Sequence, residues 1–277
     1  AADLPIIATQ EKIDLAEALG NPRMVAENML ASRKVLYRGH AVAAVAAENS
    51  HDAEEALKAI NVKYDVLEPL LDVQAAMRDT APLIHEDMTT RSLEKRFTRG
   101  SDTGIKSNVA SHLQFKRGDP EKAFQEAAIV VEREFTTQPV HQGYIEPQSA
   151  SAFWNADGQL KVWTSTQGAF AARDAIAKVL DTPVSKVTVV PMEIGGGFGG
   201  KIPIYLEPVA ALLSRKTGQP VKMQMSRIDV FESTGPTSGS WMKVKMGATR
   251  DGKIVAADAT LALEAGAFPG SPVTMGA

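Results

Sequence analysis

Residues 192–201 read MEIGGGFGGK and lie between an apolar run at 187–190 and a helix-like segment at 204–216. Glycine has no Cβ, so its backbone adopts conformations that other residues avoid and lets other groups approach its N–H closely. A strand, a glycine cluster and a helix in this order are typical of a ligand-binding loop at a strand end. The stretch is therefore the strongest candidate site, although its composition also suits a loop that only turns the chain.

Two nucleotide-binding motifs overlap on this cluster, and both are incomplete. Gly195, Gly200 and Lys201 match most of a P-loop, but Ile202 stands where that motif needs a metal-binding hydroxyl. Gly195, Gly197 and Gly200 match a dinucleotide fingerprint, yet no acidic residue follows about 20 positions on. A P-loop-like nucleotide-binding protein is therefore the weakest of our hypotheses for the function of this chain.

The composition narrows the function classes. The 277 residues include 30 basic and 33 acidic side chains, and a net charge of -3 favours neither nucleic acid nor an anionic membrane as a partner. The sequence has no bilayer-spanning apolar stretch and does not begin like a leader peptide, so we expect a cytoplasmic protein without membrane insertion. With no cysteine, this chain holds no thiolate-bound zinc or iron–sulfur cluster, and redox chemistry would pass electrons to another chain.

The N-terminal region has the pattern of a small α/β domain. The apolar run 41–47 predicts a buried strand, and the alternating residues 62–66 predict a half-buried one. Between them, Ser50 is expected to cap a helix over 51–60, whose acidic first turn suits the positive end of the helix dipole.

The chain divides into two regions at a polar stretch. Residues 89–110 have almost no apolar periodicity, which predicts a linker between an N-terminal domain at 1–88 and a second domain at 111–277. The second domain mixes helices and strands, so its class is α+β. Its predicted elements are a helix at 120–128, a strand at 129–135, a hairpin at 150–154 and 160–164, helices at 169–180 and 204–216, and a hairpin at 242–246 and 253–263.

A second loop repeats the topology of the glycine cluster. Residues 165–168, Ser-Thr-Gln-Gly, end one predicted strand and precede the helix at 169–180. Ligands of helix-covered sheets tend to bind where such loops gather at the carboxyl ends of strands. We therefore expect Gln167 and the loop 195–200 to line one pocket, with capping of its own helix as the equal alternative for Gln167.

Several motifs together resemble a known family. They are GYIEPQ at 143–148, WTSTQ at 163–167 and GGGFGGK at 195–201. In this combination they are similar to the large subunit of the xanthine dehydrogenase and aldehyde oxidase family of molybdenum hydroxylases, and KIPIY at 201–205 looks more like its carbon monoxide dehydrogenase-type bacterial branch. YRGHAVAAVAA at 37–47 is similar to the family's α/β hammerhead domain.

The resemblance implies a molybdenum–pterin cofactor, with the cytosine dinucleotide as one form. It implies that Gln167 hydrogen-bonds an oxo group, that Gly197, Phe198 and Gly199 pack beside the metal with N–H groups toward its oxygens, and that no side chain ligates the metal. The implied reaction is hydroxylation of an aldehyde, an N-heterocycle or a related small substrate with oxygen from water. Iron–sulfur clusters and FAD are then expected on partner subunits.

The resemblance leaves parts of the enzyme outside this sequence. The family's general-base glutamate and any copper-binding cysteine are expected beyond residue 277, and none of Glu146, Glu193 and Glu207 matches the catalytic position. The chain alone is therefore expected to be inactive. Ile202 stands where purine-oxidising members have a substrate-contacting glutamate, which disfavours xanthine. A non-catalytic scaffold or assembly subunit of the same architecture is the main alternative.

Overall fold

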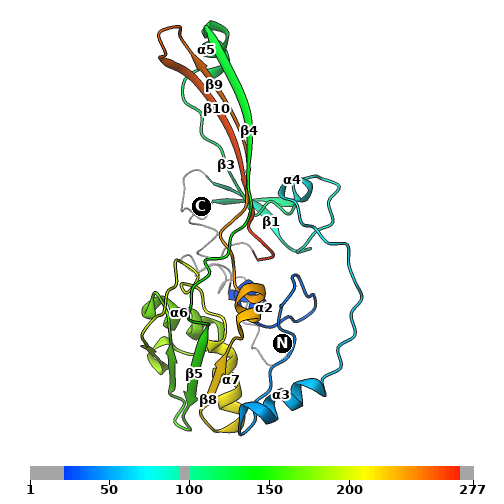
Figure 1. Cartoon of the computed structure of the whole chain (residues 1–277), viewed down its shortest axis with the longest axis vertical. Coiled ribbons are helices and arrows are strands. Elements are labelled where there is room, and N and C mark those ends of the chain that lie inside the picture. The colour runs from blue at the N-terminus through cyan, green and yellow to red at the C-terminus, as the bar shows by residue number, and fades with distance from the viewer. Residues whose placement is uncertain (1–21, 94–99, 269–277) are drawn as a thin grey trace. The chain divides into compact units, whose positions relative to one another are not determined.

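The computed structural model describes residues 22–93 and 100–268, and the chain packs into two compact units (Figure 1). The first unit combines the described residues of Ala1–Leu67, His141–Pro236 and Gly266–Gly276, and the second those of Glu68–Val140 and Thr237–Ala265. Each unit draws on sequence from both sides of 89–110. The two domains expected from the sequence, 1–88 and 111–277, remain a prediction.

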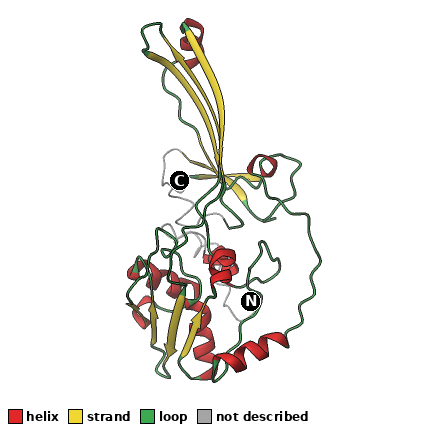
Figure 2. Ribbon diagram, in the orientation of Figure 1, coloured by secondary structure: helices red, strands yellow, loops and turns green. Residues whose placement is uncertain are grey.

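A four-stranded sheet forms the centre of the first unit (Figure 2). β5 pairs antiparallel with both β6 and β8, whereas β6 and β7 run parallel. Gly158, with φ of 82°, makes the turn between β5 and β6, which confirms the hairpin expected there. In sheet order the strands are β7 (Val187–Pro191), β6 (Leu160–Thr164), β5 (Ser149–Trp154) and β8 (Val221–Gln224).

Helices cover one face of this sheet. α6 (Ala169–Val179) follows β6, α7 (Glu207–Thr217) follows β7, and both confirm helices predicted from the sequence. α2 (Pro22–Met29) packs against α6. The first unit also contains the short helices η1 (Val184–Lys186) and α8 (Arg227–Ser233). The buried apolar side chains between the sheet and its helices include Ala152, Leu160, Val162, Ile176 and Ala210.

The N-terminal part of the first unit contains the expected helix with a different cap. α3 (Ser50–Lys58) matches the helix predicted over 51–60. Its N-cap is Asn49, whose side-chain oxygen accepts the N–H of Asp52 at 2.9 Å. Asn and Ser are almost equally good caps, so local sequence alone did not separate Asn49 from Ser50.

The two strands predicted beside α3 do not form. Residues 41–47 and 62–66 have no strand structure, and residues 62–66 are exposed. A strand needs a neighbour to pair with its N–H and C=O groups, and no described strand lies alongside either stretch. An apolar or alternating pattern was therefore not sufficient to predict a strand. None of the helices in the described ranges is long and apolar enough to cross a lipid bilayer.

The second unit contains a long antiparallel sheet of order β10-β9-β4. The strands are β4 (Ile129–Thr137), β9 (Ser240–Ala248) and β10 (Ile254–Leu263), which confirms the strand and the second hairpin predicted there. Just before β9, Thr237 bridges Val140, with N–H to C=O distances of 3.3 and 2.9 Å.

Shorter elements complete the second unit. α5 (Pro120–Glu126) matches the helix predicted over 120–128, is capped by Asp119 and packs on β9 and β10, and α4 (Val73–Ala76) is a single turn. Residues 89–110, predicted to be a linker, include strands of a small sheet. β1 pairs antiparallel with one of the other two strands of this sheet and parallel with the second. The strands are β1 (Thr89–Leu93), β2 (Ser101–Lys106) and β3 (Ser111–Leu113).

A buried carboxylate joins α7 to the sheet. Glu207 is 5% exposed, and its two oxygens accept the Thr164 hydroxyl and the Tyr205 N–H, each at 2.8 Å. Burial raises the pKa of Glu207, and the hydrogen bonds only partly oppose that effect. The folded state therefore holds the proton of Glu207 more tightly than the unfolded state.

This pKa shift predicts a pH-dependent stability. A carboxyl group with a raised pKa in the folded state supports folding below its ordinary value of 4.5, and that support is lost as the pH rises through the raised pKa. In Glu207→Gln the amide can accept from Tyr205 and donate to Thr164, so we expect its melting temperature to rise relative to wild type as the pH increases.

Thermal unfolding from about pH 4 to pH 8 measures this difference. The exposed Glu193, changed to Gln, is the matched control and should follow wild type. A Glu207→Gln difference that stays constant across this range would contradict the raised pKa.

Candidate functional site

The two loops that follow β6 and β7 lie side by side, as the sequence predicts. Gln167 donates its backbone N–H to the Lys201 carbonyl at 3.0 Å, and the Thr166 hydroxyl donates to the same carbonyl at 3.3 Å. The loops meet because β6 and β7 are parallel neighbours, so that both chains leave the sheet at the same edge.

The side chain of Gln167 is held by its oxygen. Oε1 accepts the N–H of Gly199 at 3.0 Å and the N–H of Lys201 at 3.1 Å. Because both groups are donors, they assign the oxygen to this position and the amide nitrogen to the other. Nε2 has no hydrogen-bond partner in the described part of the chain, and the residue is exposed. Gln167 thus presents two free N–H donors from a fixed carboxamide.

Glycine is required at the point of contact. A Cβ on Gly197 would lie 2.5 Å from Gln167 Oε1, and one on Gly200 would lie 2.7 Å from the Tyr144 ring. Real Cβ atoms do not approach other atoms this closely, so a larger residue would displace the Gln167 carboxamide or the Tyr144 ring. The glycine cluster is thus explained by close approach.

The tip of the loop is strained and carries unused donors. Phe198 has φ of 49°, a left-handed conformation that is uncommon for a non-glycine residue, and its side chain is 76% exposed. The N–H groups of Gly196, Gly197 and Phe198 make no hydrogen bond to any described residue. The resemblance implied that the Gly199 N–H points toward oxygens of the metal, but this N–H is bonded to Gln167 instead.

Lys201 points inward and pairs with Glu146. Its Nζ lies 2.6 Å from Glu146 Oε2, which also accepts the Gly195 N–H at 2.6 Å. Burial acts to raise the pKa of Glu146, but the hydrogen bonds from Lys201 and Gly195 outweigh it, and the pKa is lowered overall. The Lys201 side chain is fully buried, whereas a P-loop lysine must reach a bound phosphate. The P-loop hypothesis is therefore wrong on geometry.

Sequence reasoning missed this ion pair. Glu146 and Lys201 are 55 positions apart and lie in different motifs, so neither spacing nor periodicity links them. The missing hydroxyl after Lys201 was the available signal that this lysine does not serve a phosphate. The other two candidate carboxylates lie elsewhere: Glu193 is exposed, and Glu207 is buried between β6 and α7.

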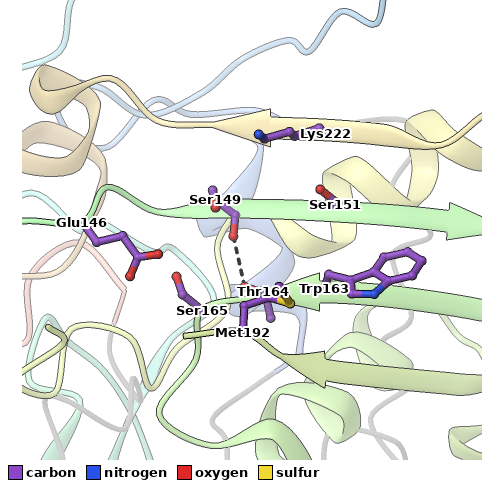
Figure 3. Close-up of a pocket in the computed structure, with 8 residues that line it drawn as sticks. All are labelled: Glu146, Ser149, Ser151, Trp163, Thr164, Ser165, Met192 and Lys222. Carbon is purple, nitrogen blue, oxygen red and sulfur yellow. Dashed lines mark hydrogen bonds between the residues drawn. The ribbon is translucent and has the colours of Figure 1, made fainter. Parts of the chain in front are cut away.

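A cavity of about 480 Å³ lies beside the two loops (Figure 3). Ser149, Ser151 and Trp163 alternate along β5 and β6 with core residues, so this part of the cavity lies on the sheet face opposite the helices. Buried Ser165 has no hydrogen-bond partner for its hydroxyl among the described residues. The complete lining is Glu146, Ser149, Ser151, Trp163, Thr164, Ser165, Met192 and Lys222.

Known families and proteins match this chain along most of its length. Residues 102–277 match the molybdopterin cofactor-binding domain, and residues 4–68 match the a/b hammerhead domain of aldehyde oxidase and xanthine dehydrogenase. The chain is 33% identical to the nicotinate dehydrogenase large molybdopterin subunit of Eubacterium barkeri, over 87% of this chain and 52% of that protein. It is 30% identical to the carbon monoxide dehydrogenase large chain of Afipia carboxidovorans, over 87% of this chain and 29% of that protein.

Solved structures give the same result. A crystal structure of Cu,Mo-CO dehydrogenase superposes with a TM-score of 0.71 and 29% identity, covering 84% of this chain and 29% of that one. The chain thus spans about half or less of the length of these relatives. Its fold class, α+β with a hammerhead and a molybdopterin-binding region, agrees with the expectation from the sequence. The chain belongs to the molybdopterin-binding family of the aldehyde oxidases and xanthine dehydrogenases.

Proposed function

We propose that this chain is part of the large subunit of a molybdenum hydroxylase, and that Gln167 and the loop 195–200 hold its molybdenum–pterin cofactor. The supporting observation is the Gln167 carboxamide, whose oxygen is bonded to two backbone N–H groups while its nitrogen has no partner among the described residues. This arrangement fixes a neutral donor beside the N–H groups of Gly197 and Phe198.

The donor set fits an oxygen-rich anionic group. Main-chain and amide N–H groups bind oxo and phosphate oxygens without adding a charge, and a donor aimed at developing charge stabilises it. When bound, the cofactor supplies two-electron redox chemistry and the site of oxygen transfer from water. In this proposal the cofactor would accept hydrogen bonds from Gln167, Gly197 and Phe198. Phe198 also forms a wall of the substrate site, and Gly199 orients Gln167.

The remainder of the enzyme is part of the same proposal. A hammerhead-like domain at 1–88, a connecting stretch at 89–110 and part of a cofactor-binding domain at 111–277 fit the two family matches. Iron–sulfur and FAD subunits would carry the electrons away, because a chain without cysteine cannot hold such a cluster on thiolates. The substrate would be an aldehyde, an N-heterocycle or a related small molecule.

Molybdenum and pterin analysis of the full-length protein separates this proposal from a scaffold role.

Removing the amide should slow cofactor reduction. We expect Gln167→Ala in the full-length protein to fold, because the side chain is exposed, and to lose on the order of 10²-fold in the rate at which substrate reduces the metal centre. Anaerobic mixing with a panel of nicotinate, xanthine and an aromatic aldehyde measures this rate, normalised to molybdenum content. Gln224→Glu, at an exposed position of β8, is the control and should react like wild type.

Gln167→Glu tests the donor alone. A carboxylate can still accept from Gly199 and Lys201, so the loop should stay in place, but it presents an acceptor where the amide presented donors. We expect this variant to reduce more slowly than Gln167→Ala and to contain less molybdenum. Wild-type rates in both variants at full molybdenum content would leave Gln167 with a structural role only.

A further inference from the structure

Lys201 is a buried cation whose ion-pair partner is Glu146. Its side chain has no solvent exposure, and its Nζ lies 2.6 Å from the carboxylate and 5.0 Å from the centre of the Tyr144 ring. Lysine is almost never buried this completely, because removing the ammonium group from water is strongly unfavourable unless a partner compensates. A loop that only turned the chain would not require such a group.

Glu146 fixes both ends of the glycine loop through one oxygen atom. Its Oε2 accepts the N–H of Gly195 and the Nζ of Lys201, and its own backbone N–H donates to the Gly195 carbonyl at 3.2 Å. Short bonds to an ionised carboxylate are stronger than neutral ones. Residues 196–200 therefore form an arch whose two ends are held by the same side chain.

The main chain of Lys201 continues this connection to Gln167. The Lys201 N–H donates to Gln167 Oε1, and the Lys201 carbonyl accepts the Gln167 backbone N–H. Gln167 Oε1 is also bonded to Gly199, inside the arch. Any displacement of Lys201 or of the arch must therefore move the Gln167 carboxamide, including its Nε2.

We propose that Glu146 and Lys201 are a positioning pair, whose ion pair holds the arch and thereby sets the direction in which Gln167 presents its amide. Lys201 is enclosed by protein and acts only through its neighbours. Glu146 lines the cavity, and in this proposal its carboxylate acts through its bonds to Lys201 and Gly195. The effect on the cofactor rests on the proposed function, whereas the connection to Gln167 does not. The Glu146 side chain is 31% exposed, and in Glu146→Gln the amide oxygen can still accept from Lys201 and Gly195, so this variant should fold.

The test uses Lys201→Met and Glu146→Gln in the full-length protein, with Lys253→Met and Glu193→Gln as exposed, matched controls. Hydrogen–deuterium exchange followed by mass spectrometry should show the peptide containing Gly199 and Lys201 exchanging about tenfold or more faster in both test variants. The Mo(V) paramagnetic resonance spectrum after partial reduction with dithionite should change. The value of kcat should fall, and KM should change less. Both controls should behave like wild type.

The outcomes separate the two proposals. A wild-type protein without molybdenum would overturn the proposed function, while the exchange measurement would still decide the positioning pair. Wild-type exchange in Glu146→Gln would overturn the positioning pair. Faster exchange with an unchanged Mo(V) spectrum in a metal-loaded variant would instead overturn the proposed role of Gln167 toward the cofactor. If Lys201→Met fails to fold, Glu146→Gln decides by the same measurements.

Discussion

The parallel pairing of β6 with β7 is the constraint on which the site depends. Two parallel neighbours end at the same edge of a sheet. The pairing of β6 with β7 ends at Thr164 and Pro191, and the next residue, Met192, donates its N–H to the Thr164 carbonyl at 3.0 Å. Antiparallel neighbours would send the two loops to opposite edges. The contacts of Gln167 with the glycine loop and the close approach at Gly197 both follow from this one pairing.

Local signals predicted β5, β6 and β7, the helices α3, α6 and α7, and several elements of the second unit. The Asp157-Gly158 turn, the Asp119-Pro120 helix start and the alternating residues of β9 each depend on near neighbours, so the sequence contains enough to predict them. The strand-loop-helix order also predicted that Gln167 would meet the glycine loop, because topology alone brings these segments together.

The parts that could not be predicted depend on distant partners. The stretches 41–47 and 62–66 have suitable side chains for strands, but a strand forms only beside another strand. The pairing of Glu146 with Lys201 joins two loops that no sequence pattern relates. The bond that turns the Gly199 N–H inward depends on the rotamer of Gln167, which follows from packing in three dimensions.

The bridge between Val140 and Thr237 bears on how such a chain evolves. These residues flank 141–236, the continuous segment that contains Gln167, Glu146 and Lys201, and their hydrogen bonds bring its two ends together. Chain ends that lie this close together are the geometry at which a segment can be lengthened or replaced while its host domain keeps its fold. The loops of the candidate site lie together in this one continuous segment, so their sequence can diverge while β4 and β9, which flank it, keep their pairing.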